Sequence, residues 1–191
     1  GGFVAFSVYL PTYQHNFYEL DMEDAALRTA VFVVIAVACR PVGGALADKF
    51  PGAWVLVVSF VVTGLMAAAA TERMPLLNTD GGTFYPLGTA VFLFMGASLG
   101  VASGAVFALV AELVEPSSVG SVTGIVGAVG GLGGFVPPLL LGYFWTAHGN
   151  YRVGLLLLFF LSLATAVLTW LWFLRSRRSD SPAAETERTS A

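Results

Sequence analysis

The stretch that decides the fold is residues 26–49, which read ALRTAVFVVIAVACRPVGGALADK. A helix that crosses a bilayer needs about 20 predominantly apolar residues, and this stretch is long enough to supply them. Between Ala26 and Ala47, the only charged residues are Arg28, near the start, and Arg40. A central arginine in a membrane helix costs at least about 2.5–3.5 kcal/mol on insertion scales. Arg40 therefore calls for a functional explanation.

The rest of the chain has the same apolar character, with 57% hydrophobic residues and only 11% charged residues. The mean hydropathy is +0.80. Because a soluble domain carries about 25% charged side chains, this chain could not cover its surface in water, and we expect membrane lipid to be its solvent. The net charge of -3 argues against a nucleic-acid partner, which would require a basic face.

Apolar runs separated by polar turns predict an all-α membrane protein, since runs of about 20 residues are too long for barrel strands. The first run is too short to cross a bilayer, so we expect a first helix that lacks its beginning. The spans are expected at residues 1–13, 26–47, 53–71, 87–111, 119–145 and 151–174, followed by a disordered tail over residues 176–191. A polar loop is expected from Gln14 to Asp24 and another from Glu72 to Pro86.

Two further features of the chain refine this arrangement. Pro137-Pro138 in the fifth span predicts a kink or a break in that helix. Basic residues follow the last span at Arg175, Arg177 and Arg178, and Lys49 lies on the same side. Because cytoplasmic loops carry an excess of Lys and Arg, this cluster favours a cytoplasmic C-terminus.

Arg40 is the first candidate functional residue. If its helix begins near Arg28, Arg40 lies roughly 18 Å along the helix at about 1.5 Å per residue. None of the expected spans contains an Asp or Glu that could pair with it. A guanidinium presents a planar fork of donors that suits small planar oxyanions. The residue therefore predicts an anion site in a water-filled cavity. The alternative is an arginine that snorkels to the membrane surface or braces the nearby turn.

Glycines in the fifth span are the second candidate feature. They are Gly120, Gly124, Gly127, Gly130, Gly131, Gly133 and Gly134. Several pairs are four residues apart, the spacing that allows close approach of membrane helices. Bare backbone could line a narrow pathway for a small ion, or the glycines could serve helix packing alone.

The remaining candidates are less specific. Ser103 could place a hydroxyl against a cavity or pack between helices. The turn that contains Gly44, Asp48 and Lys49 reads by itself as an ordinary interfacial turn. No pattern matches a catalytic triad, a metal cluster, a phosphate-binding loop or a covalent nucleophile, so we expect no enzyme, no metal and no cofactor.

Taken together, these segments resemble a known transporter family. Gly44-x-Leu46-x-Asp48-Lys49 is similar to the G-x-L-a-D-[RK] loop of the major facilitator superfamily. The stretches 40–48 (RPVGGALAD) and 124–135 (GIVGAVGGLGGF) resemble the nitrate/nitrite porter (NarK-type) subfamily and its glycine-rich nitrate signature. The opening GFVAFS at residues 2–7 is similar to the seventh helix of that subfamily.

The resemblance implies that the chain is the C-terminal half, helices seven to twelve, of a twelve-helix porter in the cytoplasmic (inner) membrane. It also implies that Arg40, Gly127, Gly130 and Gly131 bind the nitrate or nitrite anion, while Ser103 remains a further candidate from the sequence itself. Gly44, Asp48, Lys49, Gly124 and Gly134 would then belong to conformational or structural motifs. In this family a second arginine and another glycine signature come from the N-terminal half, so this chain would supply half of the site. The alternatives are a carrier of another small anion or organic acid, and a membrane module that does not transport.

Overall fold

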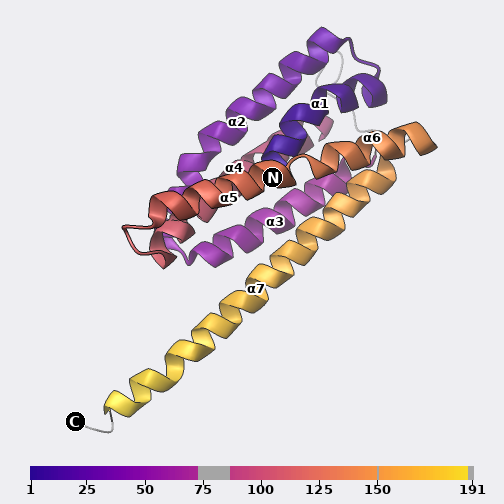
Figure 1. Ribbon diagram of the computed structural model, residues 1–191. Coiled ribbons are helices and arrows are strands. Elements are labelled where there is room, and N and C mark those ends of the chain that lie inside the picture. Colours follow the sequence, from indigo (N-terminus) through magenta and orange to yellow (C-terminus); the bar gives the residue numbers. More distant parts are fainter. Residues whose placement is uncertain (73–86, 150, 189–191) are drawn as a thin grey trace.

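The computed structural model describes the backbone of residues 1–72, 87–149 and 151–188, and side chains within these ranges as far as Arg175. Every regular element in this part of the chain is a helix (Figure 1). The helices are α1 (Gly2–Tyr18), α2 (Met22–Lys49), α3 (Gly52–Ala69), α4 (Leu87–Leu113), α5 (Val119–Gly133), α6 (Val136–His148) and α7 (Arg152–Arg188). The prediction of an all-α protein is confirmed.

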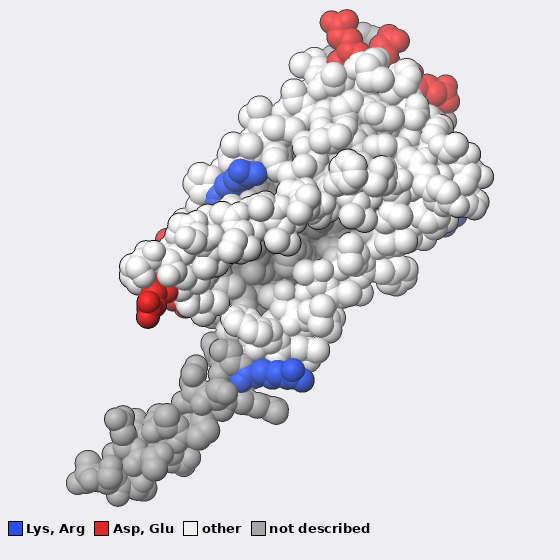
Figure 2. Space-filling view, in the orientation of Figure 1, with Lys and Arg blue, Asp and Glu red and all other residues white. Residues whose placement is uncertain are grey.

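The helices have the length and composition of membrane spans. Within the described residues, 5 segments meet both criteria: Met22–Lys49, Gly52–Ala69, Leu87–Leu113, Val119–His148 and Arg152–Arg175. Figure 2 shows acidic side chains at two ends of the face in view, with a broad and nearly uncharged surface between them. A lipid bilayer requires such a band, because a charge in its hydrocarbon core is costly. The chain is thus a multi-pass membrane protein.

The central pair of the fold is α2 and α4, which pack along their lengths. Helix α3 packs against α4 on one side and against α7 on the other. Helix α1 contacts α2, α4, α5 and α6, and its N-terminus lies in the middle of the molecule beside the end of α5 (Figure 1). The start of α1 therefore lies against the C-terminal end of α5.

Helix α1 is longer than the sequence predicts, since it continues through Gln14 to Tyr18. The polar residues after Tyr13 suggested a loop, but Gln14 is only 2% exposed. An aromatic cluster holds this end of the helix in place: the Tyr13 hydroxyl donates to the Ala70 carbonyl at 2.7 Å, and the Tyr13 and Tyr151 rings lie 4.9 Å apart. Tertiary packing of the aromatic rings therefore extends the helix beyond its apolar run. The loop that follows shrinks to residues 19–21.

The expected fifth span is divided into two helices, as Pro137 and Pro138 predict. Helix α5 ends at Gly133 and α6 begins at Val136, with prolines in its first turn. A proline has no N–H to donate to the carbonyl four residues earlier, so a continuous helix would leave the carbonyls of Gly133 and Gly134 unpaired. The break lies where those hydrogen bonds would be missing.

Two predicted segments lie wholly or partly outside the residues that the structure describes. The predicted loop from Glu72 to Pro86 falls outside the described residues after Glu72. Helix α7 continues as backbone helix to Arg188, past the end of its apolar span. The disordered tail over residues 176–191 stays a prediction.

Candidate anion site around Arg40

Arg40 lies on α2, in the half of the helix that leads to Lys49. Its Nε atom is buried and has no hydrogen-bond partner among the described residues. The ion pairs found in that part of the chain join other residues: Arg28 to Asp24 at 2.9 Å and Arg152 to Glu72 at 3.6 Å. A buried donor without a partner costs about 1–3 kcal/mol, and more when it is charged. The guanidinium is therefore suited to receive an acceptor that this part of the chain does not supply.

Phe3 on α1 is the side chain that covers Arg40. The Cζ atom of Arg40 lies 4.8 Å from the centroid of the Phe3 ring. A guanidinium over an aromatic face gains about 0.5–2 kcal/mol, depending on how far it is desolvated. Sequence reasoning missed this contact because no spacing along the chain links residue 3 to residue 40.

Helix α4 approaches the backbone of α2 at Arg40. A Cβ atom added at Gly104 would overlap the carbonyl oxygen of Arg40. Ser103, the neighbouring candidate, is half-buried, and no hydrogen bond of its hydroxyl is found in the described structure. The structure thus brings Gly104 to Arg40, whereas a role for Ser103 in binding stays a prediction.

The glycines of α5, together with Gly134 directly after it, divide into two groups. Gly124, Gly127 and Gly131 have no atom of the described structure within 4 Å of an added Cβ. The Cβ positions of Gly130 and Gly134 lie instead against the start of α1, with Gly130 at 3.5 Å from the Gly1 nitrogen. Because Phe3 lies on Arg40, the first turn of α1 connects one end of the glycine-rich helix with the arginine. Gly130 and Arg40 therefore both contact the beginning of α1, although 90 residues separate them in the chain.

Gly44, Asp48 and Lys49, which the sequence predicts in a turn, lie in the last turns of α2, and the connection to α3 is confined to residues 50–51. Asp48 and Lys49 are both exposed, and a Cβ atom at Gly44 would meet nothing within 4 Å in the described part of the chain. Among the described residues, the ion pairs found do not include Asp48 or Lys49. The conformational role of this turn therefore remains a prediction.

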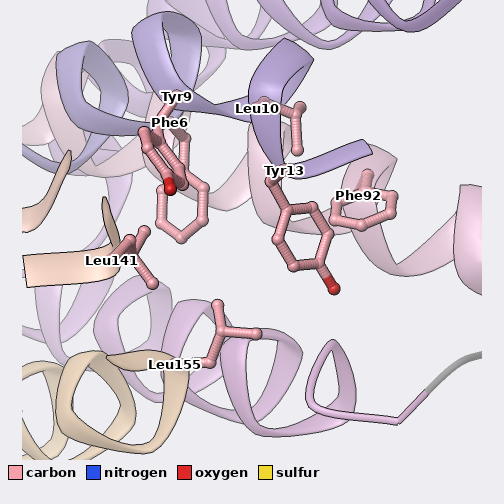
Figure 3. Close-up of a pocket in the computed structure, with 7 residues that line it drawn as sticks. All are labelled: Phe6, Tyr9, Leu10, Tyr13, Phe92, Leu141 and Leu155. Carbon is pink, nitrogen blue, oxygen red and sulfur yellow. The ribbon is translucent and has the colours of Figure 1, made fainter. Parts of the chain in front are cut away.

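One cavity of the bundle lies outside this site. It has a volume of about 10 Å³ and is lined by Phe6, Tyr9, Leu10, Tyr13, Phe92, Leu141 and Leu155. Figure 3 shows these side chains around it, with aromatic rings from α1 facing leucines from α6 and α7. Its lining offers no cationic group, so it cannot bind an anion through charge. Among the described residues there is also no group of three His, Cys, Asp or Glu that could hold a metal ion.

Comparison with known proteins gives a consistent result. The sequence model of the Major Facilitator Superfamily matches residues 1–191. The chain is 45% identical over 170 residues to the "Probable nitrate/nitrite transporter NarK2" of Mycobacterium tuberculosis, covering 88% of this chain and 41% of that protein. It is 37% identical over 191 residues to the "Nitrite extrusion protein" of Bacillus subtilis, covering 100% of this chain and 45% of that protein.

A third relative is the "Probable nitrate transporter NarT" of Staphylococcus epidermidis, which is 31% identical over 152 residues. That alignment covers 78% of this chain and 36% of the relative. The chain thus spans less than half the length of these relatives. The resemblance to nitrate/nitrite porters predicted from the sequence is confirmed.

Proposed function

The chain belongs to the major facilitator superfamily, and we propose that it is the C-terminal six-helix half of a secondary transporter for nitrate or nitrite. The observation that carries this proposal is the buried, unpartnered Nε atom of Arg40. Nitrate and nitrite are small planar monoanions, and a guanidinium offers them a planar set of charge-assisted donors. Relatives named for nitrate and nitrite transport support this choice of anion.

The proposed site is completed by a second half of the transporter. The chain spans 41% of the mycobacterial relative, and α5 has no buried residue in the described structure. Leu132 on α5 is 75% exposed. We propose that this glycine-rich helix faces the other half, which contributes a second arginine and a second glycine signature. Gly127, Gly130 and Gly131 would then line the anion path, where they offer backbone without side chains.

The proposed mechanism is alternating access. Two guanidinium groups that face each other repel when the site is empty, and an anion between them removes that repulsion. Binding would thus favour a closed state, and rocking of the halves would open the site to either side. The protein would lie in the cytoplasmic (inner) membrane, with the basic residues that follow the last apolar span, Arg175, Arg177 and Arg178, on the cytoplasmic side.

The decisive test replaces Arg40 by lysine in the full-length transporter. Lysine keeps the charge but loses the planar fork, and each charge-assisted hydrogen bond lost costs about 1.5–3 kcal/mol. We expect uptake of labelled nitrate into vesicles to be abolished at normal expression. The matched control is Arg152→Lys, because the Arg152 side chain is 67% exposed and pairs with Glu72. Normal transport by Arg40→Lys would refute the role of Arg40.

A second experiment separates nitrate and nitrite from other anions. Formate, chlorate and cyanate would compete with labelled nitrate in reconstituted vesicles if Arg40 were only a general counter-charge. We expect nitrite to compete well and formate poorly. The coding sequence upstream of residue 1 tests the third possibility, because six further helices with a matching arginine would exclude a module that does not transport.

A further inference from the structure

We propose that Gly104 on α4 is a positioning residue for Arg40, which it holds in place through backbone contact with α2. The inference rests on the proposed role of Arg40 in anion binding. Gly104 itself has no side chain with which to touch an anion. It acts by letting the backbone of α4 lie directly against the carbonyl group of Arg40.

The contact leaves no room for a side chain at residue 104. A Cβ atom there would overlap the Arg40 carbonyl oxygen, and it would come within 2.9 Å of the Gly44 nitrogen and 3.0 Å of the Arg40 carbonyl carbon. In an α-helix, the carbonyl of residue 40 accepts from the N–H of residue 44. Gly104 therefore lies against the helical turn that begins at Arg40.

The same turn of α2 is weakened by its own sequence. Pro41 lies inside the helix directly after Arg40. Because proline has no N–H, the carbonyl of Val37 loses its partner in the helix, and the proline ring crowds that carbonyl. A helix with a missing hydrogen bond bends more easily at that point. An external contact at residues 40–44 would keep the Arg40 backbone in one place.

Two further glycines near Arg40 make the same kind of backbone contact between α2 and α4. A Cβ at Gly43 on α2 would overlap the carbonyl of Val101 on α4, and a Cβ at Gly100 would overlap the carbonyl of Ala36. In each case the glycine hydrogen that replaces the Cβ points toward a carbonyl oxygen of the other helix. Such Cα–H···O contacts recur where small residues bring membrane helices together. Arg40 thus lies within a region of direct backbone contact.

The guanidinium would respond to a shift of this backbone, because its own position is narrowly defined. The Nε atom is buried, and the Cζ atom lies 4.8 Å from the centre of the Phe3 ring. If α2 moved away from α4, the guanidinium would move relative to Phe3 and to the anion. A misplacement of about 1 Å can cost a binding or reacting group about a hundredfold in effectiveness.

The test compares Gly104→Ala with Gly96→Ala in the full-length transporter. Gly96 belongs to the same α2–α4 interface, where its Cβ would meet the Phe32 ring at 3.0 Å and the Phe32 carbonyl oxygen at 3.1 Å. It lies about 12 Å from Gly104 along α4, at about 1.5 Å per residue. We expect both variants to lower the thermal unfolding temperature. Only Gly104→Ala should raise the KM for nitrate, by about tenfold to a hundredfold, with an unchanged maximal rate per inserted molecule.

Two outcomes would overturn the proposal: a normal KM in membrane-inserted Gly104→Ala, or an equal rise of KM in Gly96→Ala. If Gly104→Ala does not insert, Gly43→Ala makes the test from the α2 side, and a normal KM there also refutes the proposal. Failure of this inference can be distinguished from failure of the proposed function. Loss of transport in Arg40→Lys together with a normal KM in Gly104→Ala would refute only the positioning role.

Discussion

Two sets of glycines in this protein are spaced three or four residues apart along their helices but have different surroundings. The α4 series is Gly96, Gly100 and Gly104, and the α5 series is Gly120, Gly124, Gly127 and Gly131. Each member of the α4 series lies against α2, and at Gly100 and Gly104 an added Cβ would overlap a backbone carbonyl. In the α5 series, an added Cβ meets no atom of the described structure within 4 Å.

The difference shows that glycines at this spacing allow two helices to pack closely but do not by themselves bring a second helix into contact. Small residues at this spacing allow two membrane backbones to approach. Whether they do so depends on which helix lies opposite, and that is decided by the fold. In the α4 series, the opposite helix is α2, which carries Arg40. In the α5 series, the opposite surface is not supplied by the described part of this chain.

The largest expected effect is the destabilisation by Gly100→Ala. Its Cβ would overlap the Ala36 carbonyl oxygen, and backbone cannot rotate away as a side chain can. Overpacking of this kind costs about 1–3 kcal/mol. The measurement is the free energy of unfolding of the full-length protein in micelles. The control is Gly64→Ala, whose Cβ would make only ordinary contacts with Phe159 and Ser162 at 3.4–3.5 Å. Equal stability of the two variants would contradict the packing of α2 against α4.

A smaller effect on stability is expected in the α5 series. Because Gly127 has no close neighbour in the described structure, Gly127→Ala should leave the stability of the 191-residue chain unchanged or raise it by no more than about 1 kcal/mol, the helix-propensity difference. Nitrate transport by the full-length protein should nevertheless fall, because the methyl group would project into the proposed anion path. Destabilisation as large as that of Gly100→Ala, measured in the same 191-residue chain, would show that the two series are equivalent.

The smallest effect concerns a hydrogen bond that also holds α4. The hydroxyl oxygens of Thr63 on α3 and Ser98 on α4 lie 2.8 Å apart, and both residues are buried. Interhelical hydrogen bonds in membranes contribute about 0.6 kcal/mol on average. We therefore expect Thr63→Val to lower the free energy of unfolding by about that amount. Thr165→Val serves as a control, since that hydroxyl is exposed and bonds within its own helix. A loss as large as that of Gly100→Ala would mean that polar contacts, not glycines, position α4.

Much of the fold could be predicted because its signals are local. Apolar length predicts the membrane spans, and Pro137-Pro138 predicts the division between α5 and α6. Arg40 could be singled out because a charge within an apolar run stands out in the sequence itself. In contrast, the extension of α1 to Tyr18 depends on rings brought from elsewhere, such as Tyr151 and Phe92. No local pattern around Gln14 indicates that it is buried.

The sequence predicted the charged residue of the candidate site, Arg40, but not the residues that surround it. The contact between Phe3 and Arg40 joins α1 to α2, and nothing in the sequence predicts it. From the sequence, the closely spaced glycines of α5 were predicted to pack helices or line an ion path. No role was predicted for the more widely spaced glycines of α4. In the structure, the sparser series makes the close contacts.

By itself, the sequence determined that the chain is a helical membrane protein with a guanidinium, that of Arg40, well inside an apolar span, because lipid imposes length and polarity on every segment separately. Only the tertiary structure decided which glycines meet a backbone and which aromatic ring covers Arg40. These contacts join residues far apart in the chain, such as Gly104 with Arg40. They depend on the relative positions of whole helices, which the composition of any single helix does not specify.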